Sequence, residues 1–304
     1  MNQTQQESHQ EHRQGLLQGT LAYLIWGCFG LYFTLLAEVP ADEVLAHRIV
    51  WCVLFVGLLI LLQRKIRSTW TMITSKKTLF WLTISSLLIS GNWWIYIWAV
   101  GSGQVIAASL GYFLSPLVAV LLGLIFFKEQ LNGLQKISVL FAAIGVMWQI
   151  AAIGEFPWIA VSLSLLFGFY GVVRKQIAVD SVSGLLIETL IMLPIALIYL
   201  ALLNTQGVDH FGAFTWELIG AGVMTAVPLI LFASAARKLP LGTVGFLNYI
   251  APFMQFLSAV FILNEAFGID RFISFSFIWV GLVVFSIDLF RKSRANSMVQ
   301  TKKA

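Results

Sequence analysis

Ten stretches of mostly apolar residues alternate with short polar segments along the chain. Each stretch approaches the roughly 20 residues that an α-helix needs to cross about 30 Å of hydrocarbon. The runs are continuously apolar, as over 117–127, whereas a strand of a membrane β-barrel would alternate. The pattern therefore predicts an all-α integral membrane protein with ten transmembrane helices, at 15–36, 42–62, 78–98, 104–126, 134–151, 157–173, 183–203, 213–236, 241–263 and 272–290.

The composition supports this prediction. Hydrophobic residues make up 59% of the 304 residues and charged residues 11%, against about 45–50% and 25% in soluble proteins. With a mean hydropathy of +0.87, the chain has too little polar surface for a water-soluble enzyme or a coiled coil. The short connections leave no room for a separate soluble domain. Only a polar N-terminal tail (1–14) and a basic C-terminal tail (291–304) are expected outside the helical region.

Positively charged residues are concentrated on one side of the predicted helices. All but two of the 19 Lys and Arg residues fall in the N-terminal tail, the even-numbered loops or the C-terminal tail. The exceptions are Arg48, inside the second predicted helix, and Arg271, in an odd-numbered loop. Because cytoplasmic loops carry the excess of Lys and Arg, both termini are predicted to be cytoplasmic. The net charge of +5 thus indicates orientation, and no nucleic-acid partner is expected.

The two halves of the chain match each other at one constant offset. A proline, a glutamate and a glycine recur with identical spacing, first as Pro116, Glu129 and Gly145 and then as Pro252, Glu265 and Gly281. This repeat divides the chain into two units of five helices, 15–151 and 157–290. Because five is odd, equivalent helices must cross the membrane in opposite directions. The result is the inverted-repeat architecture of many secondary transporters.

Five short motifs are spread over nearly the whole chain. They are VPADEVLAHRIVW at 39–51, GNWW at 91–94, ASLGYF at 108–113, YGVVRK at 170–175 and LIET at 186–189. Together they resemble the RarD subfamily of EamA-type permeases, in the drug/metabolite transporter superfamily. The resemblance implies a ten-helix permease of the bacterial inner membrane and favours export. One departure is that Lys128 and Asn264 precede the repeated glutamates where this family often has glycine, which argues against a special backbone conformation there.

Three ionisable residues in predicted helices are candidates for function, because a charge at a helix centre costs about 2.5–3.5 kcal/mol on insertion scales. His47 and Arg48 lie toward the outer end of the second helix, and Glu188 lies toward the cytoplasmic end of the seventh. One interpretation is a water-accessible cavity with His47 and Arg48 toward the outside and Glu188 as a proton-coupling carboxylate. The alternative is that Arg48 reaches the outer headgroups and Glu188 pairs with a cytoplasmic Lys or Arg. A direct Arg48–Glu188 pair is not assumed, because their predicted depths differ by roughly 12 Å.

Pro116 and Pro252 fall near the centres of the fourth and ninth predicted helices. Each proline lacks an amide hydrogen, so the carbonyl four residues earlier, of Tyr112 or Asn248, loses its helical partner. Discontinuous helices at matching positions of two halves are typical of a transporter binding site. We therefore expect helix kinks at both prolines and place Asn92, Tyr112 and Asn248 on a cavity wall. A simple packing kink is the alternative.

Trp94 belongs to an aromatic cluster in the outer half of the third predicted helix. As part of a cavity wall it would hold a flat or cationic solute, whereas an interfacial aromatic belt would explain the same cluster without a solute. The repeated glutamates, Glu129 and Glu265, end the fourth and ninth helices. Structural capping or orienting roles are expected for both.

The remaining motifs separate the candidate functions. The sequence has no GxxxxGK[ST] loop for ATP hydrolysis and no HExxH or GxSxG motif, so an enzyme is not expected. Cys28 and Cys52 lack metal-ligand spacing, and neither a metal nor a cofactor is expected. The leading hypothesis is a secondary transporter that moves a small metabolite or drug-like solute by alternating access, with the solute and the lipid bilayer as its partners. A non-transporting membrane sensor or assembly subunit is the alternative.

Overall fold

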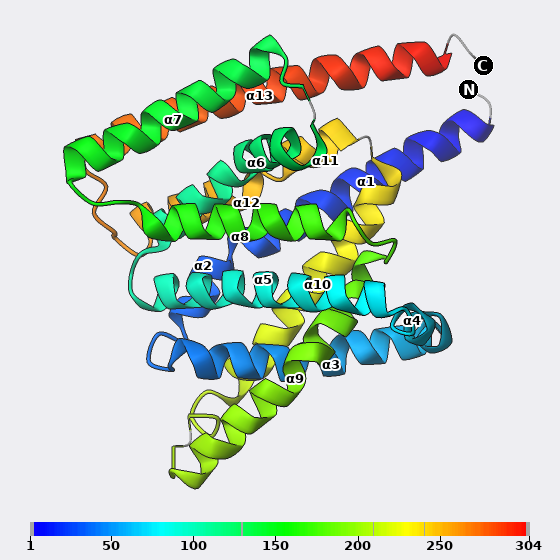
Figure 1. The fold of residues 1–304 in the computed structure, drawn as a ribbon, viewed down its shortest axis with the longest axis vertical. Helices are drawn as coiled ribbons and strands as arrows, with labels where there is room; N and C mark the ends of the chain where they lie inside the picture. Colours follow the sequence, from blue (N-terminus) through cyan, green and yellow to red (C-terminus); the bar gives the residue numbers. More distant parts are fainter. Residues whose placement is uncertain (1–2, 129, 209, 240, 302–304) are drawn as a thin grey trace.

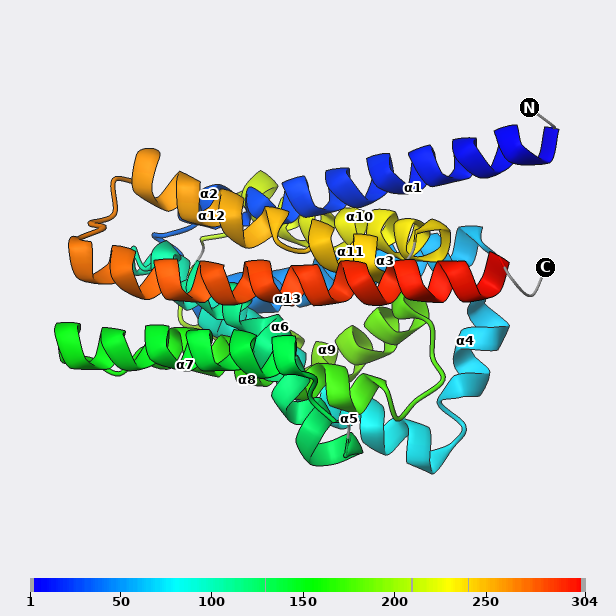
Figure 2. The ribbon, with the colours of Figure 1, turned by 90° about the horizontal axis from the view of Figure 1, so that it is seen from above.

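The computed structural model describes residues 3–128, 130–208, 210–239 and 241–301. Within these ranges every regular element is an α-helix (Figures 1 and 2). The helices are α1 (Gln3–Gly27), α2 (Phe29–Thr34), α3 (Ala41–Leu62), α4 (Ile66–Met72), α5 (Lys76–Gly101), α6 (Val105–Phe127), α7 (Gly133–Ile153), α8 (Trp158–Arg174), α9 (Ser181–Thr205), α10 (Thr215–Lys238), α11 (Leu241–Leu247), α12 (Ile250–Phe261) and α13 (Ile269–Thr301). The predicted all-α class is confirmed for this part of the chain.

Eight segments of the described chain are long and apolar enough to cross a membrane. They are Gln10–Thr34, Ala41–Leu62, Val105–Phe127, Gly133–Ala152, Ser181–Thr205, Thr215–Lys238, Thr243–Phe261 and Ile269–Arg291. The sequence pattern predicts two more spans, which correspond to α5 and α8. Helix α8 is apolar but shorter, and α5 buries a polar face made of Ser85, Ser86, Ser90 and Asn92.

Helices from the two halves pack against each other at very close range. Helix α7 runs beside α13, α1 beside α10, and α3 beside both α9 and α10 (Figures 1 and 2). A Cβ at Gly145 of α7 would lie 2.7 Å from the carbonyl oxygen of Ser274 in α13. A Cβ at Gly222 of α10 would lie 2.6 Å from the carbonyl carbon of Trp51 in α3. Small residues at these crossings therefore let the backbones touch, as is common between membrane helices.

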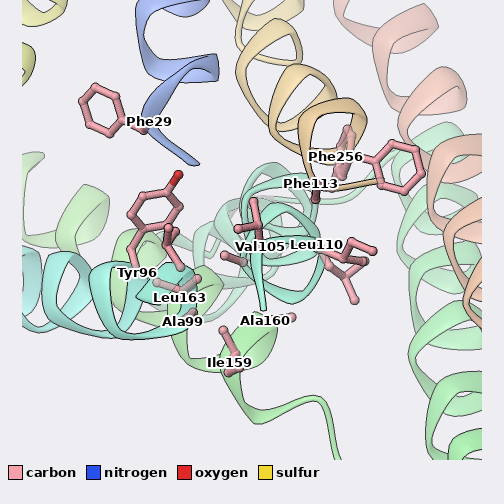
Figure 3. Close-up of a cluster of buried hydrophobic side chains, with 14 of the residues drawn as sticks. Phe29, Tyr96, Ala99, Val105, Leu110, Phe113, Ile159, Ala160, Leu163 and Phe256 are labelled. Carbon is pink, nitrogen blue, oxygen red and sulfur yellow. The ribbon is translucent and has the colours of Figure 1, made fainter. Parts of the chain in front are cut away.

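The largest buried cluster lies where α2, α5, α6, α8 and α12 meet (Figure 3). Its members include Phe29, Tyr96, Phe113, Leu163 and Phe256. On the outward faces, by contrast, large apolar side chains remain exposed, as Leu58 on α3, Leu140 on α7 and Ile198 on α9 do. An apolar exterior around a packed centre suits a surface that faces lipid rather than water.

The helix boundaries differ from the predicted ones at several places. The described parts of both predicted tails are helical, because α1 begins at Gln3 and α13 extends to Thr301. Their polar Gln, Glu, Lys and Arg residues favour helix, and no proline interrupts them. The first predicted helix is divided at Cys28, and α4 lies in a connection where no helix is predicted.

The residues before the repeated glutamates share an unusual backbone conformation. Lys128 has φ 53° and Asn264 has φ 54°, in the left-handed region that glycine adopts most easily. The expectation that these helix ends lack a special conformation is therefore wrong. Lys128 forms the left-handed cap of α6, and Asn264 follows α12. The two halves thus have the same backbone turn at equivalent positions.

The first and last described helices have their outer ends on one side of the molecule. Helix α1 begins, and α13 ends, on the same side of the molecule, where α4 also lies (Figures 1 and 2). The connections between α5 and α6 and between α12 and α13 lie on the opposite side. Most of the helices run between these two sides, as a set of membrane-crossing segments would.

Candidate functional site

A cavity of about 400 Å³ lies between α6, α8, the α11–α12 junction and α13. Two residues singled out from the sequence, Pro116 and Asn248, line it. Ser115 and Tyr249 add polar groups to the wall, and Lys175 is the one charged residue among the described residues that line it. The other lining residues are apolar or small, namely Ala119, Gly123, Phe127, Phe167, Gly168, Gly171, Val172, Gly245, Phe285 and Leu289.

A helix break adjoins this cavity. Helix α11 ends at Leu247 and α12 begins at Ile250, so Asn248 and Tyr249 connect two helices where the sequence predicts one. Pro252 cannot donate a hydrogen bond to the Asn248 carbonyl four residues earlier, which disfavours a continuous helix there. Helix α6, in contrast, continues through Pro116 from Val105 to Phe127. The structure therefore shows a break at Pro252 but none at Pro116.

Arg48 lies in a cage of aromatic rings. Its side chain is only 3% exposed, and its Nε donates to Thr225 Oγ1 of α10 at 2.8 Å. The guanidinium carbon lies 4.1 Å from the ring centre of Trp93, 5.5 Å from that of Phe33 and 5.6 Å from that of Phe29. The cage thus combines α2, α5 and α10 around a residue of α3. Arg48 points into the protein rather than to the headgroups.

Asn92 and Tyr112 form one hydrogen-bonded unit. The Tyr112 hydroxyl donates to Asn92 Oδ1 at 3.2 Å, and Asn92 Nδ2 donates to the Leu163 carbonyl at 3.0 Å. The Tyr112 ring also packs against Tyr96, at 5.6 Å, and against Phe167, at 6.4 Å between ring centres. Because Phe167 lines the cavity, this unit connects the cavity wall with the interior around α5.

Glu188 lies in a separate polar network. Its carboxylate accepts from Ser85 at 2.6 Å and from Tyr170 at 3.3 Å, and it forms an ion pair with Arg174 at 3.4 Å. Only 1% of the Glu188 side chain is exposed. Arg174 also donates to the carbonyls of Val179 and Asp180. Glu188 therefore has a cationic partner from the loop that the sequence places in the cytoplasm, and Arg48 has its own, different partners.

His47 and Trp94 lie apart from the cavity. The His47 ring stacks on Phe211, with 5.1 Å between ring centres and an interplanar angle of 13°. Trp94 is 37% exposed, and its indole donates to Asp42 at 2.5 Å. Neither residue lines the cavity. The six residues proposed to line one cavity thus fall into three groups. Arg48 lies near Asn92 and Tyr112, Asn248 lines the cavity, and His47 and Trp94 lie apart from it.

Glu265 caps a helix of the other half. Its two carboxylate oxygens accept from the amides of Val105, at 2.6 Å, and Ile106, at 2.9 Å, which begin α6. Burial raises the pKa of this carboxyl above its usual range, while the two amides and nearby Arg271 act in the opposite direction. The contact is the kind of capping role expected from the sequence. Its repeat partner, Glu129, lies outside the described residues.

Several residues of these networks are missed by sequence reasoning. Thr225, Ser85 and Tyr170 are uncharged, and Arg174 is counted as an ordinary loop charge. Hydroxyl groups within otherwise apolar helices are the one signal that could have identified the first three. Among the described residues, no group of three or more His, Cys, Asp or Glu residues is placed to hold a metal ion.

Comparison with known proteins gives consistent matches. The EamA-like transporter family matches residues 13–150. Protein RarD of Escherichia coli (strain K12) is 42% identical over 94% of this chain and 98% of its own length. The uncharacterized transporter YojE of Bacillus subtilis is 40% identical over 95% of this chain and 98% of its own. A crystal structure with 19% sequence identity has the same fold, with a TM-score of 0.58 over 91% of this chain and 98% of the other.

Proposed function

The chain belongs to the RarD group of the EamA-like transporter family, and we propose that it exports a small metabolite or drug-like solute by alternating access. As the relatives and the apolar helices indicate, it is a multi-pass inner-membrane transporter rather than an enzyme. Helices α5 and α8 complete ten spans, arranged as two inverted repeats with both termini in the cytoplasm. The matching left-handed residues Lys128 and Asn264 support this arrangement, as do the start of α1 and the end of α13 on one side.

The observation that carries the proposal is the cavity beside the α11–α12 break. A break exposes backbone groups that a solute can contact at mid-membrane depth, and broken helices mark binding sites in many transporters. Beyond the cavity, rings from α6, α12 and α13 close the interior. Phe256 lies 5.2 Å from Phe275, and Phe113 lies 6.2 Å from Trp279, between ring centres. A cavity on one side and a ring cluster on the other is what one state of an alternating-access cycle requires.

Two cavity-lining residues lie at helix ends: Phe127 ends α6, and Lys175 directly follows α8. Both helices lead into loops that the charge pattern assigns to the cytoplasm. On α13, Trp279 of the ring cluster precedes the cavity-lining Phe285 by six residues, or about two helical turns. The cavity therefore faces the cytoplasm and the rings close the outer side, which suits loading of a solute for export.

Glu188 is the proposed proton-coupling residue. It is the buried carboxylate whose charge is balanced by Arg174 at the end of α8, next to Tyr170. Tyr170 packs against the cavity-lining Phe167, with 6.2 Å between ring centres. Protonation of Glu188 removes its attraction for Arg174 and so alters the contact between α8 and α9. The cavity wall and the proton site thereby respond to each other.

The test is solute flux in proteoliposomes, measured for a library of metabolites and drugs with and without a pH gradient. We expect saturable flux of at least one solute, stimulated by the gradient. In Glu188→Gln protein, flux should persist while its stimulation by the gradient is lost. Glu38→Gln, which removes an exposed carboxylate, is the matched control. No flux above protein-free vesicles would contradict transport, and full pH dependence in Glu188→Gln would contradict only the proton role.

A further inference from the structure

Among the described residues, no carboxylate forms an ion pair with the buried guanidinium of Arg48. Its Nη1 atom is buried and has no hydrogen-bond partner. The ion pairs between two described residues join Arg174 to Glu188 and His210 to Glu43, and neither includes Arg48. A buried ion without a partner costs several kcal/mol, so such groups are normally paired or functional.

The aromatic cage compensates only part of this cost. Trp93, Phe33 and Phe29 present ring faces to the guanidinium, and cation–π contacts attract a desolvated cation. The rings offer no lone pair for the N–H groups of Nη1. Thr225 accepts a hydrogen bond from Nε of Arg48 but not from Nη1. The cage therefore surrounds the charge but leaves the N–H groups of Nη1 without an acceptor.

A second unsatisfied polar group lies in the same neighbourhood. The hydroxyl of Tyr96 is buried and has no hydrogen-bond partner. Its ring lies 6.1 Å from Phe33 and 6.5 Å from Phe29, between ring centres, and these are two of the three rings around Arg48. Figure 3 shows the Tyr96 hydroxyl directed toward the helix that carries Phe29. Two free donors near one charge fit a ligand that accepts hydrogen bonds and is negatively charged.

Aromatic contacts connect the cavity with the Arg48 cage. Phe167 of the cavity wall packs on Tyr112, which packs on Tyr96 beside the Arg48 cage. Movement of these rings would join the cavity to Arg48.

We propose that the transported solute is an organic anion and that its carboxylate binds Arg48 Nη1 and the Tyr96 hydroxyl. This inference rests on the proposed transport function and adds the class of substrate. A guanidinium and a carboxylate form short, charge-assisted hydrogen bonds, which are about twice as strong as neutral ones. Thr225 and the rings hold the guanidinium in place before the anion arrives. Binding therefore supplies the counter-charge that the described chain lacks at this site.

The experiment compares anions with matched neutral compounds on the purified full-length protein. The probes are benzoate and lactate, the corresponding amides, and chloride. Binding is measured by intrinsic tryptophan fluorescence, to which Trp93 beside Arg48 contributes, and by flux in proteoliposomes. We expect saturable binding of a carboxylate and at least tenfold weaker binding of its amide. Arg48→Gln should lower carboxylate affinity at least tenfold, and Arg48→Lys should lower it less, because the charge remains without the planar fork.

The controls separate folding, charge and transport. Arg67→Gln removes an exposed arginine of α4 and should leave carboxylate affinity unchanged. Tyr96→Phe, which keeps the ring, should weaken carboxylate binding severalfold and thereby test the site in a protein whose Arg48 is intact. Equal binding of acids and amides, binding of chloride alone, equal affinity in Arg48→Gln, or no carboxylate signal would overturn the anion site. Carboxylate binding that depends on Arg48 but occurs without flux would support the site while contradicting transport.

Discussion

Two buried ionised side chains of this protein are stabilised in different ways. Glu188 has a hydroxyl donor from Ser85, another from Tyr170 and a cation from Arg174. Arg48 has one hydroxyl acceptor and otherwise aromatic faces. Since the cost of burying an ion falls only when its charge and its hydrogen bonds are both matched, Glu188 is compensated by the fold and Arg48 is not. The two residues thus differ in whether partners in the fold offset the cost of burying their charge.

The Glu188–Arg174 pair can be tested by a double-mutant cycle. Arg174→Gln leaves a carboxylate that is 1% exposed without its cation, and we expect a loss of about 2–3 kcal/mol in unfolding free energy. Glu188→Gln should cost about 1 kcal/mol, because Arg174 is partly exposed and keeps two carbonyl partners. The double variant should be more stable than Arg174→Gln alone. Thermal unfolding in detergent measures these differences, and strictly additive losses would show that the two side chains do not interact.

Sequence reasoning located two buried ionisable residues, Arg48 and Glu188, and missed most of their partners. Charges in apolar helices are rare, so Arg48 and Glu188 are conspicuous in the printed sequence. Thr225 and Ser85 are not, because a single hydroxyl in a helix commonly bonds its own backbone. The Thr225 hydroxyl bonds its own backbone and also a charged side chain, since it donates to the Ala221 carbonyl and accepts from Arg48. Which hydroxyl meets a charge depends on helix packing, which the local sequence does not encode.

At the scale of elements, apolar runs predicted where helices lie but not where they stop. Polar residues at both chain ends continue α1 and α13, because helix propensity does not require hydrophobicity. A proline marks the division between α11 and α12, yet α6 accommodates Pro116 within one helix. A proline therefore indicates a possible break, and the packing around it decides whether the helix divides.

The contact between α3 and α10 depends on a glycine. A Cβ at Gly222 would lie 2.5 Å from Trp51 Cβ and 2.7 Å from the Cys52 amide nitrogen. Because the nearest atoms include backbone, Gly222→Ala should force these helices apart and lower the unfolding free energy by roughly 1–3 kcal/mol. Gly57→Ala in α3 is the control, since its Cβ would meet only Leu186 at 3.9 Å. Thermal unfolding of both variants gives the comparison, and equal stability of the two would refute the close-packing argument.

At the scale of the whole molecule, the two halves are interleaved rather than stacked as separate units. Helices of the first half pack on helices of the second, as α7 does on α13 and α3 on α9 and α10. The sequence predicted the repeat from three aligned residues. It could not predict this interleaving, because pairing between distant helices is set by surface complementarity. The Arg48 cage, with Thr225 contributed by the second half, is one product of the interleaving.

The topology makes a direct prediction for reporter fusions. Alkaline phosphatase fused after Gly103, between α5 and α6, should be active, because this connection is expected outside the cytoplasm. Phosphatase fused after Lys175 or at the C-terminus should be inactive, and green fluorescent protein at the C-terminus should fluoresce. Immunoblots confirm that each fusion is expressed equally. Active phosphatase at the C-terminus would place the two ends differently and would invalidate the inverted repeat.

Glu265 joins the connection after α12 to the first amides of α6, and so links the two halves of the chain at one face. Because the Glu265 carboxylate accepts hydrogen bonds from main-chain amides, rotation of a side chain on α6 cannot break this contact. The amino end of α6 and the segment after α12 must therefore move together as long as both hydrogen bonds are intact. Opening of the protein on this face therefore requires that both Glu265 hydrogen bonds break first.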